Sequence, residues 1–227
     1  MFGLELVMAS WLTMASWQDD IKCEPQRKPR VTVLPSKSPL KFNFQKSRDE
    51  LQQLEIDTIS PYGPGVETHL NGAMSGAIQL ETKVSYLSNT YSHPNYPGEE
   101  QSCIFVDQIQ VNIHFDPTIY IVREYPKGTC EHEAVMEHEK KHLKVNQIVI
   151  NKYTERISKT LSYAMNKYGT SYGPFFVAET PGVYERLKEY YVGIVKDEEK
   201  RMYAELLKLN QDIDTIEEYE RVRNACL

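Results

Sequence analysis

The sequence predicts an α+β fold, in which an antiparallel β-sheet is followed by two long antiparallel helices. Residues 77–86 and 104–115 alternate between apolar and polar side chains, as half-buried strands do. Residues 130–168 carry an apolar stripe at near-heptad spacing with no proline or glycine until Gly169, which is typical of one long helix. A second helical pattern over 180–209 follows a short loop, so the two helices should lie antiparallel.

We expect the sheet to contain an antiparallel hairpin. Asp116 and Pro117 separate the strand pattern 104–115 from residues 118–124, which are rich in β-branched and aromatic side chains. Aspartate followed by proline is typical of a turn, so the two segments are predicted to pair as neighbouring antiparallel strands. A short extended run over 31–34 is predicted to add an edge strand.

Length and composition indicate one folded domain with an N-terminal appendage. Of the 227 residues, 41% are hydrophobic and 26% are charged, which is close to the average for globular proteins and excludes wholesale disorder. We expect a signal or anchor segment over 1–17, a linker with the edge strand over 18–60, one domain of catalytic size over 61–220 and a tail over 221–227. The first segment has the length and apolar character of a signal peptide, although Glu5 departs from that pattern, and a docking helix is the alternative.

The net charge and the spacing of the cysteines limit the possible partners and the cellular location. The formal net charge of -6 argues against a nucleic-acid partner, because a phosphate backbone requires a basic surface. Cys23, Cys103, Cys130 and Cys226 are widely spaced, without the C-x-x-C pairs of a thiolate zinc site. Two disulfides would suit an exported protein, periplasmic or extracellular. Three pairings are possible, and four unrelated buried thiols are the alternative.

The chemistry-bearing motif is His-Glu-x-x-His at residues 138–142, inside the predicted long helix. Thr129 is a natural N-cap for that helix. Residues four apart lie on one helix face, so His138 and His142 can bind one metal ion, for which zinc is the typical choice. Glu139 lies outside this pair and is predicted to act as a general base that accepts a proton from a zinc-bound water. The reaction class that follows is hydrolysis of an amide or peptide bond.

A third protein ligand must come from outside the motif, because no histidine follows at the short spacing that some zinc proteases use. If the second helix folds back, its C-terminal part lies level with the motif. This placement predicts Asp214 as the third ligand, with Glu205 and Asp212 as alternatives, while Glu198 and Glu199 are less well placed.

The remaining histidines and tyrosines give weaker signals. His132 is six residues before His138, so it is predicted to point away from the metal face as a surface residue of the first helical turn. The other three stand alone and favour structural roles: His69, His93 and His114. Tyr153 and Tyr172 are among 15 tyrosines that could stabilise an oxyanion, and the sequence does not choose between them.

Residues 125–132 (YPKGTCEH) leading into 137–142 (EHEKKH) resemble a bacterial family of secreted zinc-dependent proteases, a domain of unknown function within the zincin superfamily. The resemblance covers roughly residues 60–220. It implies a zincin-like fold with the sheet packed on the active-site helix, zinc as the cofactor, and a location outside the cytoplasm. Only His138, Glu139 and His142 carry over. The family pattern has a His-Gly pair near an Asp-Thr pair, whereas no His-Gly follows Asp214-Thr215 here.

Three functional hypotheses follow from these observations. The first is a zinc metallopeptidase that acts on peptide or protein substrates, with no nucleic-acid partner and with a weak membrane tether through the N-terminus. The second is a zinc-binding scaffold or assembly protein of the cell envelope without catalytic activity. The third is a metal-free scaffold. An open ligand position in a cleft would favour the first, and a closed fourth ligand would favour the second.

Overall fold

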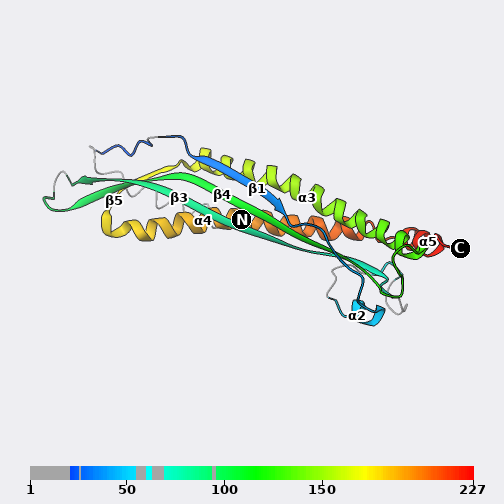
Figure 1. The fold of residues 1–227 in the computed structure, drawn as a ribbon. Helices are drawn as coiled ribbons and strands as arrows, with labels where there is room; N and C mark the ends of the chain where they lie inside the picture. Colours follow the sequence, from blue (N-terminus) through cyan, green and yellow to red (C-terminus); the bar gives the residue numbers. More distant parts are fainter. Residues whose placement is uncertain (1–20, 26, 55–59, 63–68, 94–95) are drawn as a thin grey trace. The chain divides into compact units, whose positions relative to one another are not determined.

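The computed structural model describes residues 21–25, 27–54, 60–62, 69–93 and 96–227. The predicted signal segment 1–17 lies outside these residues. The described chain forms five strands, four α-helices and one 3-10 helix (Figure 1): β1 (Arg30–Lys37), β2 (Lys41–Asn43), α2 (Arg48–Gln52), β3 (Gly72–Ser92), β4 (Glu100–Ile121), α3 (Cys130–Tyr168), β5 (Ser171–Phe176), η1 (Val177–Glu179), α4 (Thr180–Gln211) and α5 (Ile216–Asn224). The predicted linker 18–60 therefore contains β1, β2 and α2.

Both long helices are confirmed, because their signals are local. The Thr129 side chain accepts a hydrogen bond from the His132 backbone N–H at 3.3 Å, and α3 then runs unbroken to Gly169, whose φ of +77° ends it. Lys152 pairs with Glu205 at 2.6 Å, which places the C-terminal part of α4 beside the middle of α3. Arg156 follows Lys152 in α3 and pairs with Glu198, which precedes Glu205 in α4, so the two helices are antiparallel there, as expected.

All other strands of the sheet pair with β4. β5 pairs with it in antiparallel orientation, but β2 pairs in parallel, with Lys41 opposite Thr118 and Asn43 opposite Tyr120. The expected antiparallel sheet is therefore wrong. The alternation of side chains identifies a strand, whereas strand direction depends on which distant segment lies alongside.

The predicted hairpin is also wrong, because Asp116 and Pro117 lie inside the single strand β4. Burial alternates without a break from Ile109 to Ile121, so a continuous strand keeps one face buried. Pro117 lacks a backbone donor, and the pairing with β2 begins only at the next residue. The Asp116 carboxylate forms an ion pair with Lys41 at 2.7 Å.

The chain divides into two compact units. The first comprises the described parts of 1–33, 82–111 and 157–196, and the second comprises those of 34–81, 112–156 and 197–227. In the first unit, fully buried Tyr191 and Leu161 belong to the core, and a disulfide joins Cys23 to Cys103.

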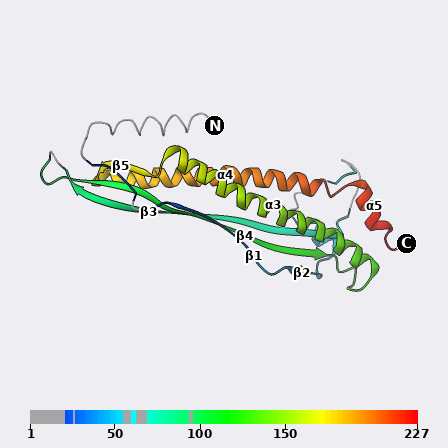
Figure 2. The ribbon, with the colours of Figure 1, turned by 90° about the horizontal axis from the view of Figure 1, so that it is seen from above.

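In the second unit the sheet packs directly on the N-terminal half of α3. Ile119 and Ile121 of β4 form a buried cluster with Val135 and Met136 of α3. β3 approaches equally closely, because a Cβ atom at Gly72 would lie 2.7 Å from a carboxylate oxygen of Glu139. Because a larger side chain would clash there, glycine is required where β3 meets the motif. Figure 2 shows β3 and β4 running beside this part of α3.

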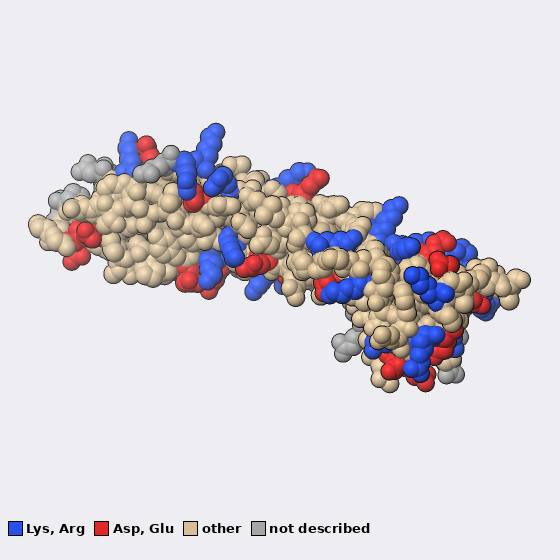
Figure 3. Space-filling model, viewed as in Figure 1, with Lys and Arg blue, Asp and Glu red and all other residues tan. Residues whose placement is uncertain are grey.

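A second disulfide joins Cys130, the first residue of α3, to Cys226, just after α5. All four cysteines are paired, which indicates a non-reducing environment such as that of exported proteins. Among the described residues, no helix combines the length and apolar character needed to cross a membrane. On the face shown in Figure 3, acidic and basic side chains are interspersed.

Candidate metal centre

The two motif histidines point at each other from one face of α3. The Nε2 atoms of His138 and His142 are 3.2 Å apart, and the side chains are buried, with residue exposures of 9% and 6%. This follows from their spacing of four residues on a helix. Two buried imidazoles with facing nitrogens can supply two ligands to one metal ion.

Asp214 completes the cluster from the connection between α4 and α5. Its Oδ1 atom lies 3.2 Å from Nε2 of His138 and 3.1 Å from Nε2 of His142, and the residue is only 4% exposed. These three residues are the group of potential metal ligands found among the described residues. In a tetrahedral zinc site with bonds of about 2.0–2.1 Å, neighbouring ligand atoms lie about 3.3 Å apart. The three separations observed here therefore fit a zinc ion.

The outer nitrogens of both histidines are also engaged. Nδ1 of His138 lies 3.2 Å from Oε1 of Glu218, and Nδ1 of His142 lies 3.0 Å from Oδ1 of Asn210. Both partners can accept a hydrogen bond from an N–H group at Nδ1. A neutral ring with its hydrogen on Nδ1 keeps the Nε2 lone pair for a metal ion, as in metal sites where a carboxylate or carbonyl orients the ligating histidine.

Glu218 is itself held by basic neighbours. Its carboxylate accepts hydrogen bonds from Arg221 at 2.8 Å and from Lys141 at 2.8 Å. Arg221 above all, together with Lys141 and His138, holds the pKa of Glu218 well below its usual range, against the opposing effect of burial. Glu218 is therefore an anion that faces His138 at any physiological pH.

Glu139 lies next to the ligand group but outside it. The residue is 4% exposed, it receives a hydrogen bond from the Met74 backbone, and it lies against the glycine that begins β3. Burial raises the pKa of Glu139 to about 7, although the two histidines oppose this shift. A carboxyl group with a pKa near neutrality is suited to exchange protons with a substrate or water.

The charges of the cluster depend on one another. Burial favours the neutral form of His138 and His142, but Asp214 and Glu139 outweigh it, so that the pKa of each histidine is raised. In turn the two histidines lower the pKa of Asp214 against its own burial. A metal cation would replace the protons that this anionic surrounding attracts.

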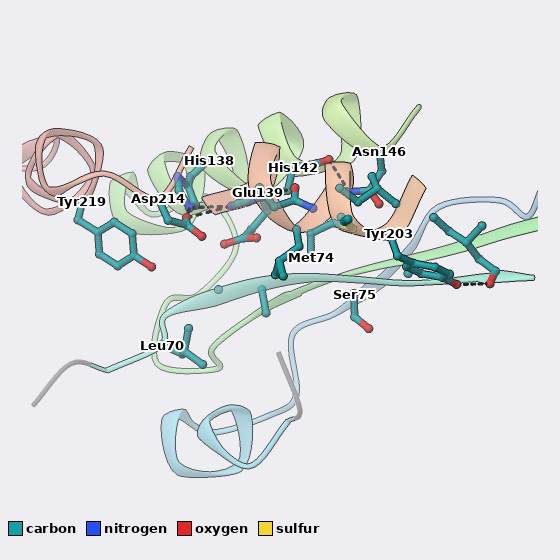
Figure 4. Close-up of a pocket in the computed structure, with 18 residues that line it drawn as sticks. Leu70, Met74, Ser75, His138, Glu139, His142, Asn146, Tyr203, Asp214 and Tyr219 are labelled. Atoms are coloured by element: carbon teal, nitrogen blue, oxygen red, sulfur yellow. Dashed lines mark hydrogen bonds and ion pairs between the residues drawn. The ribbon is translucent and has the colours of Figure 1, made fainter. Parts of the chain in front are cut away.

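The centre opens into a cavity of about 420 Å³, which Figure 4 shows with Glu139, Asp214 and Tyr219 along it. Tyr219 comes from α5, and its ring packs edge-on against His138 with 5.9 Å between ring centroids. Burial raises the pKa of Tyr219 above its usual value, so the phenol stays protonated and can donate a hydrogen bond.

The other acidic candidates lie elsewhere. Glu205 accepts hydrogen bonds from Lys152 and Tyr153, and exposed Asp212 pairs with Lys208 at 2.8 Å. Buried Glu198 forms an ion pair with Arg201 at 2.6 Å. None of these acids, nor Glu199, belongs to the ligand group or lines the cavity. Of the five acids considered, only Asp214 is brought to the histidines.

The remaining histidines have structural surroundings. The prediction that His132 is a surface residue is wrong, because it is 2% exposed. Its Nδ1 lies 3.1 Å from the carbonyl oxygen of Tyr125, and its ring packs edge-on against Phe44, which covers this end of α3. His114 of β4 contacts Ser36 of β1 and Ser38, just after β1, at 3.0 Å each.

The last two histidines differ in exposure. His93 is buried and its ring stacks on that of Phe176 in the first unit. His69 is exposed and lines a second cavity beside the metal centre.

Three residues of the site were not anticipated: Asn210, Glu218 and Tyr219. A signal for the last two was present, because Thr215 followed three residues later by Glu218 is a helix-start pattern. The Thr215 side chain does accept a hydrogen bond from the Glu218 backbone at 3.2 Å, and α5 begins there. Of the tyrosines considered from sequence, Tyr172 donates to the Gly169 carbonyl at 2.8 Å, outside the site.

Comparisons with known protein families, with curated proteins and with solved structures found no match to this chain. The resemblance to secreted zinc-dependent proteases consequently stays a prediction from the motif and its flanking residues.

Proposed function

We propose that this protein is a zinc-dependent hydrolase, and more specifically a metallopeptidase, that works outside the reducing cytoplasm. The observation that carries the proposal is the convergence of three buried ligand atoms, from His138, His142 and Asp214, beside a buried glutamate in a cleft. Three protein ligands with room for water are typical of catalytic zinc, whereas structural zinc has four.

The donor set and its supports fit zinc. Two neutral imidazoles and one carboxylate match the ligands of known zinc hydrolases, and Glu218 and Asn210 hold the outer nitrogens of the imidazoles. Zinc held there would polarise the scissile carbonyl group and make a water molecule acidic enough to react near neutral pH.

Glu139 moves the proton in this scheme. Its carboxylate accepts a proton from the attacking water, whose oxygen forms a bond to the carbonyl carbon of the substrate. The carbon–nitrogen bond then breaks, and Glu139 delivers the proton to the departing amine. The hydrogen bond from Met74 and the close contact with Gly72 fix the carboxylate for this transfer. Its pKa near 7 suits both the acceptance and the release of a proton.

The test compares Glu139→Gln with a matched control on the same helix, Glu133→Gln, at an exposed residue. We expect the first variant to keep one zinc ion per chain and to lose peptide hydrolysis, because an amide cannot accept the proton. The control should retain both properties. Hydrolysis by the first variant at the wild-type rate would contradict the mechanism.

A non-catalytic zinc scaffold would give a different pattern. Wild-type protein would then hold zinc tightly but cleave no peptide under any condition, and the Glu139 variant would be indistinguishable from it.

A further inference from the structure

We propose that the cleft binds an extended polypeptide across the metal centre, so that the enzyme cuts within chains rather than at their ends, with a bulky apolar side chain next to the cut. This inference rests on the proposed function and adds the substrate class. The observations that carry it are two cavities that meet at the centre and the different character of their walls.

The two cavities meet at the reacting groups. The second cavity, of about 380 Å³, shares five wall residues with the first: Leu70, Gly72, His138, Glu139 and Tyr219. A substrate whose reacting carbonyl lies at His138 and Glu139 therefore has space on both sides of that bond. Each cavity falls within the range of about 300–1,000 Å³ that is typical of ligand sites.

The wall of the first cavity has an apolar part away from the centre, while Ser75 and Asn146 also line the cavity. Tyr203 and Leu207, four residues apart on α4, lie on one helix face and line it together with Ile78 of β3. Leu207 is 49% exposed, which leaves a large apolar surface open to the cleft. The Tyr203 hydroxyl donates to the Ile78 carbonyl at 2.6 Å and joins this part of α4 to β3 (Figure 4).

Among the described residues, the ionisable groups that line the first cavity are the three ligands, Glu139 and two tyrosines. Away from the metal centre, this described part of the wall holds no counter-charge for a charged substrate side chain. A charged side chain placed there would lose hydration without gaining a counter-charge, whereas a leucine or phenylalanine would bury apolar surface. The cavity therefore selects a bulky apolar residue.

Away from the metal centre, the acidic, basic and histidine side chains that line the second cavity among the described residues lie at the surface. Glu131, Arg223 and His69 line it, and all three are exposed. An enzyme that removes terminal residues needs a fixed charge that binds the free amine or carboxylate. Exposed side chains of opposite sign suit the passing of a polypeptide with polar residues instead.

The experiment uses the full-length chain loaded with zinc and a mixture of synthetic peptides, each supplied once with both ends blocked and once with both ends free, with the products identified by mass spectrometry. We expect internal cleavage with leucine, phenylalanine or methionine enriched at one position beside the cut. Leu207→Lys should lower kcat/KM for those peptides by about 10- to 100-fold and shift the preference toward acidic residues.

The matched control is Ile148→Lys on α3, at a residue that is 55% exposed and lines neither cavity. It should leave both rate and preference unchanged. Cleavage confined to free peptide ends, or an unchanged preference in Leu207→Lys, would overturn this inference and leave the proposed function intact. No cleavage of any peptide by the zinc-loaded wild type would overturn both.

Discussion

Replacing Glu218 by glutamine tests whether the α5 carboxylate sets the metal affinity. The substitution keeps the size of the side chain but removes the charge that faces Nδ1 of His138 at 3.2 Å. Loss of such an outer partner typically weakens metal binding by about 10- to 100-fold. The expected loss is therefore about 1.4–2.7 kcal/mol of zinc binding free energy. Folding stability should change by less than about 1 kcal/mol, because Lys141 and Arg221 are partly exposed and remain hydrated.

The assay is a competition titration with a chromophoric chelator, run on wild type, Glu218→Gln and the control Glu217→Gln. Glu217 is the exposed neighbour of Glu218 on α5. Circular dichroism before the titration confirms that each variant is folded. If Glu218→Gln binds zinc as tightly as wild type while Asp214→Ala binds it weakly, the outer carboxylate does not orient His138 and this part of the reasoning fails.

Three other perturbations follow from the same site. Zinc affinity should fall by about 10- to 100-fold per pH unit once the pH drops below the pKa of His138 and His142, because protons compete for the same nitrogens. The pKa of both histidines is raised, so this loss should begin at a higher pH than for free histidine. A zinc affinity that stays constant down to pH 5 would exclude these ligands. Tyr219→Phe should lower kcat by about 100-fold with unchanged zinc content, if its hydroxyl stabilises the developing oxyanion, and steady-state kinetics decides this. Replacing both Cys130 and Cys226 by serine removes a disulfide between residues 96 positions apart and should lower the free energy of unfolding by about 2–5 kcal/mol, measured by denaturant titration. An unchanged free energy of unfolding would show that α5 is held without the disulfide.

The local features of the site could be predicted from the sequence. The helix over 130–168 has an N-cap, an apolar stripe and a terminating glycine within its own sequence, and the spacing of His138 and His142 fixes their common face. These signals need no knowledge of distant contacts.

The sheet could not be predicted to the same degree. Aspartate and proline at 116 and 117 favour a turn in isolation. Buried and half-buried residues nevertheless alternate without a break from Ile109 to Ile121, as they do in one continuous strand. The parallel pairing of β2 joins residues separated by 77 positions, such as Lys41 and Thr118. Local patterns do not carry such information.

The part of the site that lies far from the His-Glu-x-x-His motif in the sequence could be predicted only in part. The expectation that the helices fold back narrowed the third ligand to a few acids, including Asp214. The choice among them depends on the turn after α4, which buries Asp214 and leaves Asp212 exposed. Glu218 was missed because the short helix α5 was not recognised, although its start signal at Thr215 was present.

The most direct test of the central claim is the metal content of the full-length chain purified without chelators, measured by plasma mass spectrometry beside His142→Ala and Asp214→Ala. We predict one zinc ion per wild-type chain and much less in each variant, since each removes one of three ligands. Wild-type protein that holds no zinc even after zinc is supplied would contradict the account, and the buried cluster would then be held by the contacts among His138, His142 and Asp214 alone.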